Sequence, residues 1–187
     1  MKSLKDYYDP AHEPGSVVVS GTALKRPVVL NPSQWTLANQ HFQEVFFSSN
    51  NHLGFHKIWR VKGYSLLGLL QTGDVTVNPQ LAITFFASDG LTYQSSLGAL
   101  TNRYYYPGLT LANETRVDPV IALYAAAMFD DQVPQGPVQW TPRPLTEDDY
   151  DRQRPRLFMG QRKGDPSDDN QPWFLGNLVE IEVNCQE

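Results

Sequence analysis

The stretch Leu81–Leu97 reads LAITFFAS, then Asp89-Gly90, then LTYQSSL. An Asp-Gly pair between two β-prone runs is the strongest short-range signal for a β-hairpin, because a two-residue turn needs the positive φ angles that glycine adopts readily. We therefore expect two antiparallel strands that meet at Asp89-Gly90. The first run is more apolar than the second, so the first strand should be central in its sheet and the second more exposed.

A two-residue turn also predicts which residues face each other across the hairpin. The expected pairs are Phe86 with Tyr93, Phe85 with Gln94, Thr84 with Ser95, Ile83 with Ser96, and Ala82 with Leu97. Because side chains alternate between the two faces of a strand, Ile83 and Phe85 would share a face that needs an apolar partner.

Length and composition favour one soluble, β-rich domain. The 187 residues fit a single core, and the 14 prolines and 13 glycines favour strands and ordered loops over helical bundles. We expect an extended N-terminal arm over residues 1–15 and one globular domain over residues 16–187. The formal net charge of −5 speaks against nucleic acid or an anionic membrane as a partner, since both attract clustered lysine and arginine.

Two segments show helix signals. Asn31-Pro32 followed by Gln34 has the spacing of a capping box, and apolar residues recur at helical intervals up to Phe47, which predicts a docked amphipathic helix over residues 32–47. Asp118-Pro119 precedes a run that is apolar on all sides, which predicts a buried helix over residues 119–129. A buried strand is the alternative there, because periodicity cannot classify a fully apolar run.

The other segments complete an α+β fold with a mainly antiparallel sheet of about six to eight strands, arranged as a sandwich or barrel. Short strands are expected at Val17–Val19 and Pro27–Leu30, and a strand-like pattern extends from Leu53 to Val77. Residues 130–172 are rich in proline, which predicts a long loop that wraps the domain or lies on a partner, and within it only Arg156–Met159 looks like a strand. Leu178–Val183 alternates and predicts a final strand with Glu180 and Glu182 facing water.

The cysteine content and the N-terminal residues indicate where in the cell the protein is expected. Cys185 is the single cysteine, so no internal disulfide can form. The first 15 residues lack the apolar run of a secretion signal, and no stretch reaches the roughly 20 apolar residues of a membrane span. We expect a cytoplasmic protein or one associated with a virion or similar particle, not one secreted by a signal peptide.

Catalytic and metal-binding motifs are weak. The sequence contains no GxSxG, no phosphate-binding loop, no HExxH and no dinucleotide fingerprint, so we expect no catalytic residues and no cofactor. His52 and His56 are four residues apart, but that spacing brings two ligands together only on a helix, and Gly54 argues against one. The acidic runs at 147–151 and 165–169 are typical of solvated loops, so no metal site is predicted.

Aromatic residues near turns are the strongest candidates for a binding surface, because tyrosine, tryptophan and arginine contribute most of the energy at protein interfaces. The predicted binding residues are Arg103, Tyr104, Tyr105, Tyr106, Trp140 and Tyr150. We therefore expect a non-enzymatic binding or assembly module, such as a subunit of a larger particle, with a protein partner or self-association. The alternative is a small-molecule-binding protein or enzyme with a pocket between sheet and helices, using His41, His52, His56 or Arg103.

Overall fold

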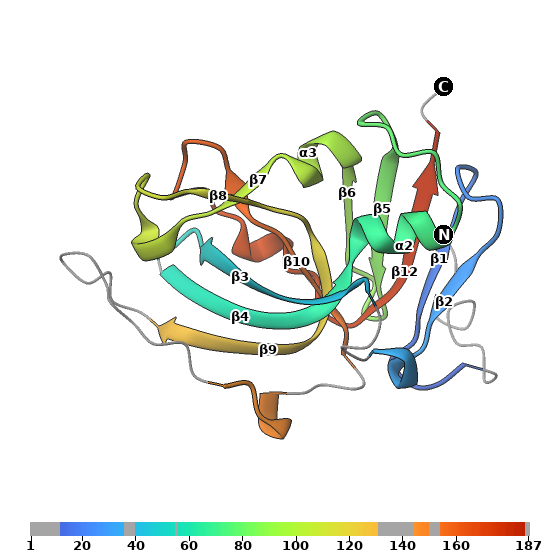
Figure 1. Ribbon diagram of the computed structural model, residues 1–187, viewed down its shortest axis with the longest axis horizontal. Helices are drawn as coiled ribbons and strands as arrows, with labels where there is room; N and C mark the ends of the chain where they lie inside the picture. The colour runs from blue at the N-terminus through green and yellow to red at the C-terminus, as the bar shows by residue number, and fades with distance from the viewer. Residues whose placement is uncertain (1–11, 36–39, 55, 131–143, 150–153, 186–187) are drawn as a thin grey trace.

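The computed structural model describes residues 12–35, 40–54, 56–130, 144–149 and 154–185, and these residues form three β-sheets and two short α-helices. The five-stranded sheet contains, in spatial order, β2 (Val28–Leu30), β1 (Val17–Ser20), β12 (Leu178–Asn184), β5 (Ala82–Ala87) and β6 (Thr92–Ser96). Figure 1 shows this sheet on the right. Its pairs are antiparallel except β1 with β12, which is parallel.

A curved four-stranded sheet crosses the other half of the molecule (Figure 1). It contains β10 (Arg156–Phe158), β9 (Val120–Asp130), β4 (His56–Ser65) and β3 (Phe42–Asn50), all antiparallel. The small third sheet contains β11 (Gln161–Arg162), β7 (Arg103–Tyr105) and β8 (Thr115–Val117). A mainly antiparallel β-fold, as the sequence predicts, is thus confirmed.

The central hairpin is confirmed, but its predicted register is wrong by one residue. Phe85 pairs with Tyr93, where the prediction paired Phe86 with Tyr93. The reason is a three-residue loop, Ser88 to Gly90, closed by the Ala87 amide donating to the Leu91 carbonyl at 2.9 Å. Gly90 supplies the positive φ of +92° that such a loop requires. As predicted, β5 lies inside its sheet and β6 forms the edge.

Replacing Gly90 with valine should lower the free energy of unfolding by about 1 kcal/mol or more, because a β-branched residue resists positive φ. A Cβ at this position would meet no atom within 4 Å, so the backbone strain alone accounts for the loss. Urea unfolding measures the effect, with Thr92→Val on the exposed edge strand as the control. Equal stability of the two variants would mean that the loop conformation is wrong.

The predicted helix over residues 32–47 is wrong. The capping signal supports one 3₁₀ turn, η1 (Pro32–Gln34), in which the Asn31 amide donates to Gln34 Oε1 at 3.3 Å. Residues 36–39 lie outside the described residues, and β3 then pairs with β4 through nine consecutive residues. Aromatic and β-branched residues such as Val45 and Phe46 prefer strands, and this long pairing overrides the local helical spacing.

The run over residues 119–129, predicted as a buried helix, is instead the strand β9, the alternative that the sequence left open. β9 lies between β4 and β10, and Ile121 and Leu123 are 0% and 2% exposed. Residues 120–123 are buried on both faces of the strand, which explains why this part of the sequence has no polar position.

The sequence predicts neither of the two α-helices; α2 (Leu66–Thr72) lies within the stretch 53–77 that is expected to be strand-like, and α3 (Leu97–Thr101) begins where the predicted hairpin ends. α2 follows β4 directly, and its first turn is capped by Ser65 Oγ, which accepts from the Gly68 amide at 3.3 Å. α3 follows β6 and is capped in the same way by Ser96. In both, a serine at the end of a strand satisfies a free amide and lets the chain turn into a helix.

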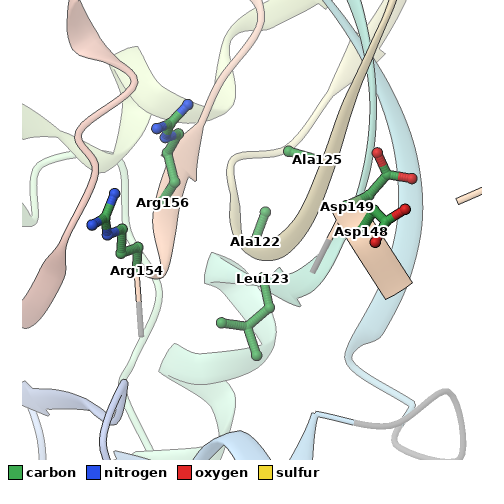
Figure 2. A pocket seen from close by; sticks show the side chains of 7 residues that line it. All are labelled: Ala122, Leu123, Ala125, Asp148, Asp149, Arg154 and Arg156. Carbon is green, nitrogen blue, oxygen red and sulfur yellow. The ribbon is translucent and has the colours of Figure 1, made fainter. Parts of the chain in front are cut away.

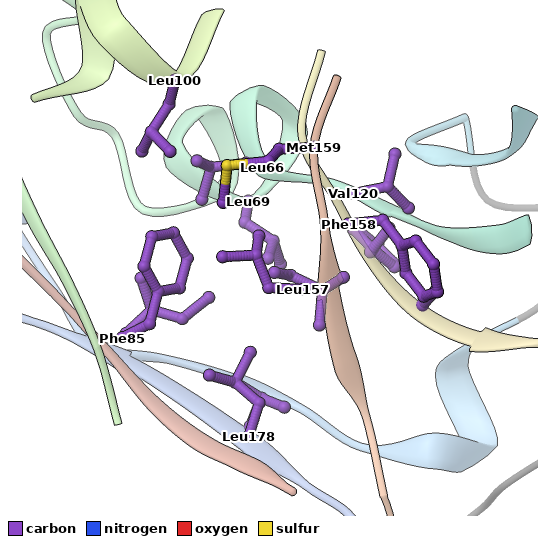
Figure 3. Packing of buried hydrophobic residues seen from close by; sticks show 14 of the residues in the cluster. Leu66, Leu69, Phe85, Leu100, Val120, Leu157, Phe158, Met159 and Leu178 are labelled. Atoms are coloured by element: carbon purple, nitrogen blue, oxygen red, sulfur yellow. The ribbon is translucent and has the colours of Figure 1, made fainter. Parts of the chain in front are cut away.

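The main core lies between the two large sheets and the two helices. Figure 3 shows side chains from six elements meeting there. They include Leu66 and Leu69 of α2, Phe85 of β5, Leu100 of α3, Val120 of β9, Leu157 of β10 and Leu178 of β12, none more than 1% exposed. The segment predicted as a loop over 130–172 therefore supplies core residues, since Leu157, Phe158 and Met159 are fully buried.

The final strand is confirmed as β12, but Glu180 does not face water as predicted. It is 5% exposed because β12 lies between β1 and β5, and its Oε1 accepts from Ser20 Oγ at 2.8 Å. The Ser20 hydroxyl provides a hydrogen bond to the buried carboxylate, which lowers the cost of burying a charged group.

Candidate functional site

The candidate site forms where β9 is irregular. Lys62 pairs with Tyr124, but the next residue of β4, Gly63, pairs with Ala122, so Leu123 is an extra residue in β9. A Cβ on Gly63 would lie 2.2 Å from the Ile121 carbonyl oxygen, so only glycine allows the two strands to approach so closely here. Such a β-bulge redirects neighbouring side chains and is frequent beside functional sites.

The segment Pro144–Asp149 packs beside this bulge. It contains the 3₁₀ turn η3 (Glu147–Asp149), and its shape is held by Asp149, whose Oδ2 accepts from the Thr146 amide at 2.8 Å and from Thr146 Oγ1 at 3.0 Å. Cavities lie on both sides of this turn, one lined by Leu145, Thr146 and Glu147 and the other by Asp148 and Asp149. We call the two cavities together the β9 groove.

The first cavity of the groove is aromatic and has a volume of about 500 Å³. Its lining includes Trp35, Phe42, Lys62 and Tyr124. The Trp35 ring contacts Tyr64 edge-on at a centroid distance of 6.4 Å, and its Nε1 is buried without a hydrogen-bond partner in the described part of the chain. The aromatic rings of the lining offer a ligand apolar surface.

The second cavity is charged and has a volume of about 300 Å³. Its floor consists of Ala122, Leu123 and Ala125 of β9. Figure 2 shows the guanidinium groups of Arg154 and Arg156 on one side of β9 and the carboxylates of Asp148 and Asp149 on its other side. This cavity can bind charged groups of either sign.

Arg103 and Tyr106 are predicted binding residues, but their side chains form contacts inside the domain. Tyr106 is 0% exposed, and its hydroxyl donates to the Arg162 carbonyl at 2.7 Å. Arg103 Nη1 forms an ion pair with Asp168 Oδ2 at 2.9 Å, and Asp168 also accepts from Arg162 Nε at 2.7 Å. These contacts join β7 to the chain after β11, so neither side chain is free for a partner.

The two neighbouring tyrosines are half-buried. Tyr105 packs against Phe46 at a centroid distance of 6.2 Å, and burial raises the pKa of its phenol to about 12. Lys163 Nζ lies 5.7 Å from the centroid of the Tyr104 ring. The remaining predicted binding residues, Trp140 and Tyr150, lie outside the described residues.

The structure does not bring the histidines of the alternative prediction together. His41 precedes β3 at one end, whereas His56 pairs with Asn50 at the other, so about 30 Å of strand separates them. Burial lowers the pKa of the His56 imidazole, and His52 is exposed. Among the described residues no group of three histidine, cysteine, aspartate or glutamate side chains could hold a metal ion.

Sequence reasoning missed Arg154, Arg156 and Trp35 as site residues. The sequence does contain a signal for the two arginines. They flank Pro155, and residues two apart in an extended segment point to the same side, so Arg154 and Arg156 are expected to lie together. Nothing in the sequence indicates the bulge at Leu123, which depends on pairing with β4.

Comparisons with models of known protein families, with curated proteins and with solved structures found no match. The part of the chain that the structure describes also has no helix with the length and apolarity needed to cross a bilayer. The function must therefore be argued from the β9 groove itself.

Proposed function

We propose that this protein is a non-enzymatic binding or assembly module and that the β9 groove is its contact surface for a protein segment. The observation that carries the proposal is the pair of cavities beside η3, one aromatic and one charged. As a subunit of a larger particle, the protein would receive a segment of a neighbouring subunit here. Its N-terminal arm over residues 1–15 is a further contact surface in this proposal.

The chemistry of the groove supports protein recognition. Aromatic residues and arginine are enriched at the centres of protein interfaces, and a few such anchors provide most of the binding energy. The aromatic cavity, with Trp35 and Tyr124, suits an apolar anchor residue of the bound segment, while the charged cavity suits its polar neighbours. The bulge and η3 hold both cavities on the rigid frame of the sheet.

Light scattering coupled to size-exclusion chromatography tests this proposal on the full chain. The expected result is a molar mass that rises above the 21.1 kDa of the monomer as concentration increases. Leu145→Asp places a carboxylate beside Glu147 in the aromatic cavity and should weaken association about tenfold or more, equivalent to about 1.4 kcal/mol. Leu111→Asp, at a residue that is 59% exposed, is the control and should associate normally.

Small-molecule binding is the second candidate function, and the size of the cavities favours it. Volumes of about 300 and 500 Å³ fall within the range of about 300–1,000 Å³ that small-ligand sites occupy. A chain that remains monomeric at every concentration would overturn the assembly proposal in favour of this one. The same would follow if Leu145→Asp and Leu111→Asp changed association equally.

A further inference from the structure

Three charged side chains in the charged cavity lack partners. Asp148, Arg154 and Arg156 make no ion pair or side-chain hydrogen bond in the described part of the chain, and all three are exposed. Some other arginines of this protein form ion pairs, as Arg60 does with Glu44 and Arg103 with Asp168. The unpaired charges of the cavity are therefore available to a ligand.

The geometry keeps these opposite charges apart. Arg154 and Arg156 precede and begin β10, whereas Asp148 belongs to η3, and Figure 2 shows the small side chains of Ala122 and Ala125 between them. Alanine leaves the cavity open where a larger residue would fill it. A ligand that spans the floor would bring an opposite charge to each side.

We propose that this cavity binds a carboxylate and an ammonium group carried on one ligand, the carboxylate at Arg154 and Arg156 and the ammonium at Asp148. Two adjacent guanidinium groups match the two oxygens of a carboxylate. If the ligand is the segment invoked in the proposed function, the inference rests on that function, and the segment carries an acidic and a basic residue close together. A free amino acid has the same chemistry.

The charge balance favours this class of ligand over a phosphate. The described residues of the lining include two arginines and two aspartates, whose formal charges cancel. A phosphate, with roughly two negative charges at neutral pH, would be attracted at one side and repelled at the other. A zwitterionic ligand is attracted at both.

Binding of a series of ω-amino acids of increasing length to the full chain tests the proposal. Glycine, β-alanine, 4-aminobutanoate and 6-aminohexanoate separate the two charges by increasing distances, while butanoate and butylamine carry one charge each. Titration followed by ¹H–¹⁵N NMR should show saturable shifts at Ala122 and Ala125. At one chain length, binding should be about tenfold tighter than for either singly charged compound.

Variants assign the binding to the named side chains. The double variant Arg154→Gln/Arg156→Gln should abolish the preference for amino acids, and Asp148→Asn should reduce the best amino acid to the level of butanoate. Arg26→Gln, at an exposed arginine on the β1–β2 connection, is the matched control and should bind normally. Unchanged melting temperatures would show that each variant is folded, since all these residues are exposed.

Blocked peptides distinguish the two sources of the ligand. Acetylated and amidated peptides with lysine and glutamate separated by zero to two glycines should bind as tightly as the best ω-amino acid if a protein segment is the ligand. Binding of free amino acids alone would keep the proposed chemistry and assign it to a small molecule, whatever the light-scattering result. Butanoate binding as tightly as every amino acid, phosphate binding more tightly, or no saturable shift would overturn the inference.

Discussion

Alanine in place of Asn170 is expected to lower the free energy of unfolding by about 3 kcal/mol or more. The Asn170 side chain is 0% exposed and makes three hydrogen bonds to the backbone. Its Oδ1 accepts from the Asn50 amide at 3.0 Å, and its Nδ2 donates to the carbonyls of Ser48 and Met159, each at 3.1 Å. Each buried backbone group left without a partner costs about 1–3 kcal/mol.

Urea unfolding of Asn170→Ala measures this loss, with Asn102→Ala as the control because Asn102 is exposed and caps α3 through its backbone amide. Asn170→Asp is a second test. It keeps the acceptor for the Asn50 amide but turns a carboxylate oxygen towards the two carbonyls, so it should also destabilise the fold. A loss below about 1 kcal/mol in both variants would contradict the proposed role of this side chain.

Phe158→Ala is expected to lower the free energy of unfolding by about 3–5 kcal/mol, the usual cost of emptying a buried aromatic site. Phe158 is 0% exposed and contacts three other aromatic rings. The centroid distances are 4.7 Å to Phe174, 5.5 Å to Trp59 and 5.9 Å to Phe47. These rings come from β3, β4 and the η4 turn (Gln171–Trp173) with its cap, so the loss should affect the whole fold cooperatively.

Thermal melting followed by near-ultraviolet circular dichroism measures this effect, because the cluster includes Trp59. Leu53→Ala is the control, since Leu53 is 67% exposed and should change stability by no more than about 0.5 kcal/mol. If Phe158→Ala were as stable as the control, residues 154–172 would be a surface segment and not part of the core.

The polar contacts of residues 161–170 explain how this segment forms part of the domain. Gln161 Nε2 donates to the carbonyls of Pro166 and Asp168, and Asp168 accepts from Arg103 and Arg162. Asn50 Nδ2 in turn donates to the Ser167 carbonyl at 2.7 Å. Hydrogen bonds from buried side chains to backbone carbonyls specify one arrangement of the chain without regular secondary structure.

The residues of the candidate site could not be predicted from the sequence alone. Arg103 and Tyr106 have the residue types of an interface, yet the fold buries or pairs them. Trp35 lies in the segment that the sequence predicts as a helix, and only the packing of the 144–149 segment places it at a cavity. Residue type indicates what chemistry a side chain can do, whereas exposure and neighbours depend on contacts between distant segments.

The features that could be predicted from the sequence arise from contacts between neighbouring residues. The positive φ of Gly90, the cap at Asn31 and the short strands around Gly21 all follow from interactions within a few residues. Long-range contacts are needed to explain why residues 42–50 and 120–130 are strands, because each segment has apolar residues compatible with either a helix or a strand. Pairing with β4 over nine or more residues selects the strand in both cases, and the bulge at Leu123, with the cavities beside it, exists only through that pairing.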